Sequence, residues 1–233
     1  MIASHATSST PWSLPPDLDF PAVPERYRGV WQRTLLETPQ GRDTTTQVHW
    51  LQTDRWHADL RVPEGVDPNT PEGRQQLQGF CGLTRITSGK GGQPDVCTWH
   101  RLWDIQPPRS TPDAGYMVFE APDRLIETGV HGQYLEVWER LPGTDGPFSV
   151  ECRPAPAASD THNPTKPHNP GSAGVLVLKA GVCSMTVHPR MVAWPDDLQP
   201  DETLAHLVGR HPRMAHALLD FSISLVMENG SEA

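Results

Sequence analysis

Two glutamates and a tyrosine form the group of side chains in this sequence best suited to acid/base chemistry. Glu127 precedes a turn at 129–132, and Tyr134 and Glu136 follow it. With a two-residue turn at 131–132, Glu127 lies opposite Glu136; with a four-residue turn it lies opposite Tyr134. In both registers the three side chains share one face of the hairpin. Two carboxyl groups in one pocket repel, so one keeps its proton near neutral pH while the other ionises. The pattern therefore predicts a catalytic acid and base, with Tyr134 donating to charge that develops on a substrate.

The opposite face of the same hairpin supports a second interpretation. Ile126, Leu135 and Val137 alternate with the polar residues and also favour burial. If this apolar face points inward, the two glutamates are solvated and do no chemistry. His131 lies in the turn, so we expect it at the surface.

Tryptophans on neighbouring strands could line a binding pocket. Trp99, Arg101 and Trp103 occupy alternate positions and would share one face, an aromatic wall with one cation in it. Such a wall suits a planar or anionic ligand. The alternative is that the tryptophans only pack the core. The predicted ligand-binding residues are Trp50, Trp99, Arg101, Trp103 and Trp138.

Other reactive residue types show no site pattern. No two of the histidines on strands (His49, His57, His100 and His188) have a spacing that puts two ligands on one face, so we predict no metal site. The cysteines Cys81, Cys97, Cys152 and Cys183 form no Cys-x-x-Cys pair, and we expect four free thiols. The sequence contains no Gly-x-Ser-x-Gly elbow.

The elements that must position these side chains are strands. Segments rich in Val, Thr, Trp and Leu alternate with Gly- and Pro-containing turns, which predicts a mainly β, antiparallel barrel of about 8–12 strands. The predicted strands are 28–37, 44–53, 55–62, 79–87, 95–105, 115–120, 123–128, 132–140, 147–152, 175–180, 182–188 and 217–227.

The end of the chain should supply one helix and the closing strand. Leu204, Leu207 and Val208 fall on one face of a helix at 201–210, with Asp201 as its N-cap. Residues 217–227 alternate between apolar and polar side chains, and we expect them to pair with the first strand and close the barrel. We expect residues 1–26 to be an extended arm and 27–233 to be a single β-barrel domain with a Pro-rich loop at 153–174.

The first strand carries a motif with a known counterpart. Gly29-Val30-Trp31 resembles the Gly-x-Trp signature of lipocalin-like proteins of the calycin group, and the segment from Trp99 to Arg140 resembles uncharacterised bacterial members. The resemblance implies a barrel that holds one small ligand, with the tryptophan closing one end under an arginine, for which Arg140 and Arg190 are the candidates. It also implies apolar metabolites or haem as ligands and, in a minority of relatives, isomerase, cyclase or decarboxylase activity.

Composition restricts the class of partner. The net charge is −9 and lysine occurs only at Lys90, Lys166 and Lys179, so neither nucleic acid nor an anionic membrane is an expected partner. The start has no signal-peptide pattern and no segment is long and apolar enough to span a membrane, so we expect a cytoplasmic protein. The oligomeric state has no signal in the sequence.

Together these features predict a barrel that binds a small, mainly apolar or aromatic ligand, with haem as one candidate. The alternative is an isomerase, lyase or cyclase acting on a small aromatic or unsaturated substrate with Glu127, Tyr134 and Glu136. A third, weaker interpretation is an interaction module that recruits a partner through its Pro-rich loop.

Overall fold

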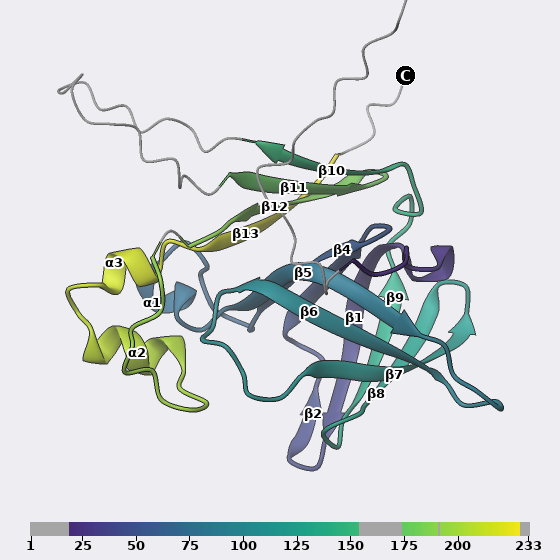
Figure 1. The fold of residues 1–233 in the computed structure, drawn as a ribbon, viewed down its shortest axis with the longest axis horizontal. Coiled ribbons are helices and arrows are strands. Elements are labelled where there is room, and N and C mark those ends of the chain that lie inside the picture. Colours follow the sequence, from purple (N-terminus) through teal and green to yellow (C-terminus); the bar gives the residue numbers. More distant parts are fainter. Residues whose placement is uncertain (1–18, 154–173, 191, 229–233) are drawn as a thin grey trace, which may run out of the picture.

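The computed structural model describes residues 19–153, 174–190 and 192–228. Its centre is a closed antiparallel barrel of eight strands, as the sequence pattern predicts (Figure 1). The barrel strands are β1 (Gly29–Thr38), β3 (Gln47–Gln52), β4 (Trp56–Val62), β5 (Gln78–Thr87), β6 (Asp95–Asp104), β7 (Asp113–Ala121), β8 (Arg124–Gly129) and β9 (Leu135–Arg140).

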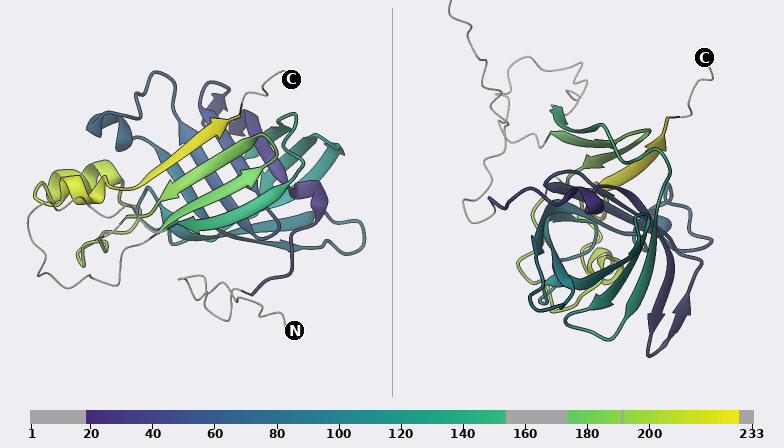
Figure 2. Two further views of the ribbon diagram at one scale, coloured as in Figure 1. Left: turned by 90° about the horizontal axis from the view of Figure 1, so that it is seen from above. Right: turned by 90° about the vertical axis from the view of Figure 1, so that its right-hand side faces the viewer.

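Each barrel strand pairs with the next along the chain, and pairing of β1 with β9 closes the ring. The view along the barrel in Figure 2 shows this ring of strands. A short strand, β2 (Gly41–Asp43), pairs only with the far end of β1, so the β1–β2 hairpin extends beyond one rim.

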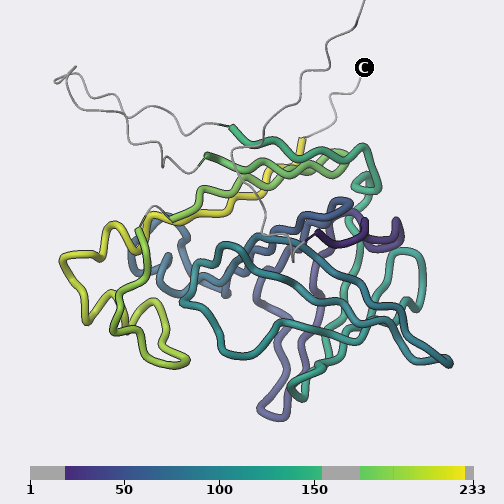
Figure 3. Tube along the Cα trace, in the orientation of Figure 1, coloured from purple at the N-terminus to yellow at the C-terminus, as the bar shows by residue number. Residues whose placement is uncertain are grey.

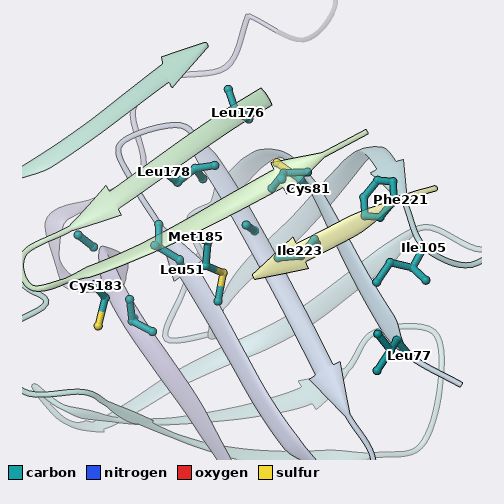
Figure 4. Packing of buried hydrophobic residues seen from close by; sticks show 14 of the residues in the cluster. Leu51, Leu77, Cys81, Ile105, Leu176, Leu178, Cys183, Met185, Phe221 and Ile223 are labelled. Atoms are coloured by element: carbon teal, nitrogen blue, oxygen red, sulfur yellow. The ribbon is translucent and has the colours of Figure 1, made fainter. Parts of the chain in front are cut away.

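A second sheet covers part of the barrel wall. It contains β10 (Phe148–Arg153), β11 (Val175–Ala180), β12 (Cys183–His188) and β13 (Ser222–Met227), in that order. Leu178, Met185 and Ile223 from this sheet pack against Leu51 and Cys81 on the outer face of the barrel (Figure 4). The outside of β3–β5 is therefore buried as well as the inside.

Closure by the C-terminal strand is the part of the predicted fold that is wrong. β13 pairs with β12, beside which it lies in Figure 3, and β1 pairs with β9 instead. The alternation of 217–227 correctly indicates one buried face, but alternation carries no information about which sheet the face meets. The strand is also shorter than predicted, because Ala215–Leu218 form the short helix α3.

The helices are short and lie near one end of the barrel. They are α1 (Pro71–Arg74), α2 (Leu204–Arg210) and α3. The predicted helix at 201–210 begins three residues late: Thr203 is its N-cap, and its hydroxyl accepts from the His206 N–H, whereas Asp201 has a φ of 55°. None of the helices in the described part of the chain is long and apolar enough to cross a membrane.

Predictions for the two Pro-rich segments fall largely outside the described residues. Residues 1–18 of the expected arm and 154–173 of the expected loop are not described. The rest of the arm runs without regular structure into a 3₁₀ helix, η2 (Glu25–Tyr27), directly before β1. All four cysteines are free.

The Gly-x-Trp motif closes the barrel end nearest η2. Trp31 is fully buried, its indole N–H donates to the carbonyl of Tyr27 at 2.8 Å, and the Arg140 guanidinium lies 4.6 Å from its ring centre. Arg140 also donates to the carbonyls of Arg28 and Arg26 at 2.9 and 2.7 Å. Gly29 has a φ of 129°, which favours glycine at the first position of the motif. The other candidate partner, Arg190, stacks on Trp194 instead, at 3.8 Å.

Trp31→Ala should lower the free energy of unfolding by about 3–5 kcal/mol, because it leaves a cavity and removes the surface on which Arg140 lies. Urea denaturation followed by circular dichroism measures the change. Val118→Ala is the control: Val118 is 50% exposed on β7, so its loss should change stability by less than about 0.5 kcal/mol. A loss below about 1 kcal/mol for Trp31→Ala would show that the motif does not hold this end together.

Candidate functional site

The half of the barrel interior opposite Trp31 is polar and contains a cavity of about 210 Å³. It lies where β4, β6 and β8 end and where β5, β7 and β9 begin, so adjacent strands all contribute side chains at the same level. The lining consists of Leu36, Thr38, Trp50, Asp59, Arg61, Phe80, Trp99, Arg101, Arg109, Asp113, Glu127, Tyr134, Glu136 and Trp138.

Glu127 is a buried carboxyl group of this wall, with 3% of its surface exposed. Its Oε1 accepts from the Tyr134 hydroxyl at 2.7 Å and its Oε2 accepts from the Trp138 indole N–H at 3.1 Å. Burial raises the pKa of Glu127 well above its ordinary range, and the neighbouring Glu136 raises it further. The hydrogen bond from Tyr134 acts in the opposite direction and is outweighed.

The surroundings of Glu127 can accommodate its proton. Tyr134 Oη lies 3.4 Å from the Ala114 carbonyl oxygen as well as 2.7 Å from Glu127 Oε1. When Glu127 is protonated, its Oε1–H donates to Tyr134 and the phenol donates onward to Ala114, while Trp138 still donates to Oε2. Burial also raises the pKa of Tyr134, so the phenol keeps its proton. A hydrogen-bonded chain thus runs from Glu127 through Tyr134 to the Ala114 carbonyl oxygen.

Glu136 lies directly across the strand ladder from Glu127, which is the register of the two-residue turn. It is 4% exposed, and its Oε1 accepts from the Arg33 guanidinium at 2.8 Å. Arg33 also donates to Asp43 at 2.8 Å, at the base of the β1–β2 hairpin. Glu136 is therefore held as the carboxylate of an ion pair, whereas Glu127 meets only neutral donors.

Two further arginines in the wall are each held by carboxylates. Arg61 donates to Asp59 at 2.8 Å. Arg101 donates to Asp113 and to Asp104, with shortest contacts of 2.5 and 2.8 Å, and its guanidinium lies 3.5 Å from the ring centre of Phe80. Both side chains are paired before any ligand arrives.

Three indoles form the aromatic side of the cavity. Trp50 meets Trp99 edge to face at 5.5 Å and Trp138 at 5.9 Å, between ring centres. The indole N–H of Trp50 donates to Gln52 Oε1 at 3.2 Å, so this polar edge is satisfied within the barrel.

An outer groove of about 590 Å³ leads to this cavity. The two share Trp99, Arg101, Arg109, Asp113 and Tyr134, so the cavity opens to the outside at this rim. Trp194 and Asp201, from the segment between β12 and α2, border the groove. His131 is exposed there, as its turn position predicts.

The structure brings together most of the residues singled out from the sequence. Glu127, Tyr134 and Glu136 share the cavity with Trp50, Trp99, Arg101 and Trp138. The opposite face of the hairpin, with Ile126, Leu135 and Val137, is therefore on the outside of the barrel wall.

Trp103 is the exception. It does not share a face with Trp99 and Arg101, because a β-bulge places Trp103 opposite Cys81 but Arg101 opposite Gly82. The extra residue reverses the alternation. Trp103 stacks on Trp56 at 6.0 Å, packs into the core outside the barrel and borders the outer groove.

Two glycines that sequence reasoning missed make room for the site. A Cβ on Gly115 would lie 2.5 Å from Glu127 Cγ, and a Cβ on Gly129 would lie 2.5 Å from the Tyr134 ring. Gly115 and Gly129 are cross-strand partners on β7 and β8. Their signal was the presence of glycine inside a strand, which often marks close approach of another group. The inward-facing charged residues Arg33, Asp59 and Arg61 were also missed, because charged residues on strands ordinarily face solvent.

Haem does not fit this site. A cavity of about 210 Å³ is below the roughly 300–1,000 Å³ of pockets for drug-sized ligands, and no histidine is among the residues that line it. Within the described ranges, no group of three or more His, Cys, Asp or Glu side chains could hold a metal ion. Comparison of the chain with protein-family models, with curated proteins and with solved structures gives no match.

The raised pKa of Glu127 predicts a specific pH dependence of stability. The groups that face it are Glu136, Tyr134, Asp113, Arg61 and Cys97. Above its ordinary pKa of 4.5, the carboxyl group ionises in the unfolded chain but not in the folded one. In that pH range the unfolded state binds fewer protons than the folded state. The contribution of Glu127 to the free energy of unfolding is therefore fully present below pH 4.5 and is lost as the pH rises through the pKa of the folded state.

Glu127→Gln removes this titration. From pH 5 upward, the free energy of unfolding of the variant should increase relative to that of the wild-type protein by up to roughly 1.4 kcal/mol per pH unit. The increase should stop at the pKa of Glu127 in the folded state. Urea denaturation of both proteins at a series of pH values measures the difference. Glu139→Gln, at an exposed position on the neighbouring strand β9, is the control. A difference that does not change with pH would show that Glu127 titrates normally.

Gly115→Ala should destabilise the fold by about 1–3 kcal/mol, because the new methyl group overlaps the Glu127 side chain. In a Glu127→Ala background, which lacks the Cγ, the same substitution should cost less than about 0.5 kcal/mol. The double-mutant cycle is measured by urea denaturation. Equal costs in both backgrounds would mean that Gly115 does not make room for Glu127.

Proposed function

We propose that the protein binds a small aromatic or unsaturated molecule in the polar half of the barrel and transfers a proton to it from Glu127. The observation that carries this proposal is the carboxyl group of Glu127, which is buried in the wall of an accessible cavity and hydrogen-bonded to Tyr134 at 2.7 Å. A buried, protonated carboxyl group with a neighbouring ionised one is the arrangement that acid/base catalysis requires.

The second carboxyl group has a complementary role. Glu136, held by Arg33, is the base that accepts a proton while Glu127 donates one. Burial removes both groups from competing water, which strengthens their action on a bound molecule. Tyr134 donates a hydrogen bond to Glu127 after the proton has left, and so stabilises the carboxylate that results.

Hydrolysis of an aromatic enol ether illustrates the chemistry. Glu127 gives its proton to the terminal alkene carbon, the π-electron pair forms the new C–H bond, and an oxocarbenium ion results. Water adds to this ion and loses a proton to Glu136. Glu136 then returns that proton to the departing alcohol oxygen, and the remaining hydroxyl proton passes to Glu127 as the ketone forms. Both glutamates finish in their starting states.

The alternative is a binding protein that holds such a molecule without changing it. The barrel with Trp31 and Arg140 at one end supports a relationship to lipocalin-like proteins, and that relationship allows both functions. The buried carboxyl pair favours the enzyme, because a site for an apolar ligand alone has no need of two glutamates at its wall.

The proposal predicts turnover of α-methoxystyrene to acetophenone and methanol, which absorbance and proton NMR detect. In D₂O, the acetophenone methyl group should carry one deuterium from Glu127. Glu127→Gln and Glu136→Gln should each reduce the rate by about 10²–10⁴, since each removes one acid/base group. Tyr134→Phe should also slow the reaction.

Glu139→Gln is the matched control, because Glu139 lies on the same strand as Glu136 but is exposed and pairs with Arg124. This variant should keep the wild-type rate. Turnover that survives Glu127→Gln would contradict the assignment of the acid. Absence of turnover by the folded wild-type protein, together with binding of the enol ether, would favour the binding protein.

A further inference from the structure

Three indole rings line the place where a ligand would lie. Trp50, Trp99 and Trp138 come from β3, β6 and β9, and all three line the inner cavity. The edge of Trp138 is engaged by Glu127 and that of Trp50 by Gln52. The electron-rich face of an indole attracts positive charge, and the attraction increases when water is excluded.

The charges of the cavity are unequal. Arg33, Arg61, Arg101 and Arg109 stand against six carboxyl groups at or directly behind the wall. These are Asp43, Asp59, Asp104, Asp113, Glu127 and Glu136. Arg33 and Arg101 each bridge two carboxylates, and Arg61 is bound by Asp59. Whether Glu127 is protonated or ionised, these residues include more carboxylates than guanidinium groups.

The paired state of Arg101 changes the ligand that the sequence suggested. A planar or anionic ligand was expected because one arginine was predicted to share a face with tryptophans. In the structure its guanidinium is occupied by Asp113, Asp104 and the face of Phe80. Arg109 is the one of these four arginines without a carboxylate within 4 Å among the described residues; it lies exposed at the rim and donates to Gln78 at 3.4 Å.

We propose that the cavity is complementary to positive charge: it binds small organic cations, and its substrate is a neutral, electron-rich molecule that becomes a cation when Glu127 protonates it. The second half of this inference rests on the proposed function. After proton transfer, the cation lies between the indole faces and the new Glu127 carboxylate, so charge is separated only within the site. A site that stabilises such a charge binds a stable cation of similar shape more tightly than the neutral substrate.

A comparison of three probes of similar size tests the sign of the charge. Benzylammonium, benzyl alcohol and benzoate are titrated into the wild-type protein at pH 7, followed by tryptophan fluorescence and calorimetry. Benzylammonium should bind at least about tenfold more tightly than the other two. Its binding should release a proton as Glu127 ionises beside it, which appears as a heat that differs between phosphate and Tris buffers.

Three variants connect this preference to the site. Glu127→Gln should abolish the proton release and reduce benzylammonium affinity by about tenfold or more, with little effect on benzyl alcohol. Trp99→Leu should also weaken benzylammonium selectively, because it removes one indole face. Arg109→Gln removes a positive charge at the rim and should not weaken benzylammonium binding. Glu139→Gln, at an exposed position outside the cavity, is the matched control and should leave the affinity unchanged. Near-UV circular dichroism verifies that each variant is folded.

The inference is overturned if benzoate binds most tightly and Arg109→Gln removes that binding, because the cavity is then an anion site. It is also overturned if the three probes bind equally, or if none binds at millimolar concentration. Selective benzylammonium binding without turnover of α-methoxystyrene would leave the cation site standing and reject the proposed catalysis. Turnover of α-methoxystyrene without a preference for benzylammonium would support the proposed catalysis and reject the cation site.

Discussion

Glu127 and Glu136 face each other across β8 and β9 inside a closed barrel, and much of the interior can be understood as a response to that pair. A buried carboxyl group has either to be neutral or to have a cationic partner. Glu136 has a cationic partner, Arg33. Glu127 is neutral and is hydrogen-bonded to Tyr134 and Trp138. Arg33 in turn requires Asp43, which ties the β1–β2 hairpin to the site.

The closed barrel makes this arrangement possible because its two ends are built differently. At one end Trp31, Tyr27 and Arg140 seal the interior with aromatic rings and a guanidinium. At the other end, charged side chains line a cavity that opens into the outer groove. The sealed end keeps water from reaching the cavity through that end of the barrel, so the cavity opens only toward the outer groove among the described residues.

The four-stranded sheet contributes by covering the outside of the wall. Leu51 and Ala58 point outward from β3 and β4 and are buried by Leu178, Met185 and their neighbours. Those same strands present Trp50 and Asp59 to the cavity. Strands that are packed on both faces have little freedom to shift, which favours a site whose hydrogen-bond distances must be maintained.

Sequence alone determined the local part of this protein. Period-two alternation located most strands, the Gly29-x-Trp31 motif indicated the end plug, and the short turn after Glu127 fixed the face shared with Tyr134 and Glu136. These features depend on residues near one another in the chain, where steric rules and turn geometry act directly. Four of the five residues that the sequence predicts to bind a ligand line one cavity.

Tertiary structure decided which surfaces meet. Alternation cannot say whether the apolar face of 222–227 packs inside the barrel or against its outside, and it packs outside. A single bulged residue turned Trp103 away from the cavity, and no pattern in the sequence reports a bulge. Pairing of Arg101 on β6 with Asp113 on β7, which occupies the guanidinium that the sequence offered to an anionic ligand, depends on a distance between different strands. Electrostatic complementarity is a property of all the charges in a cavity together, and only the closed barrel assembles them.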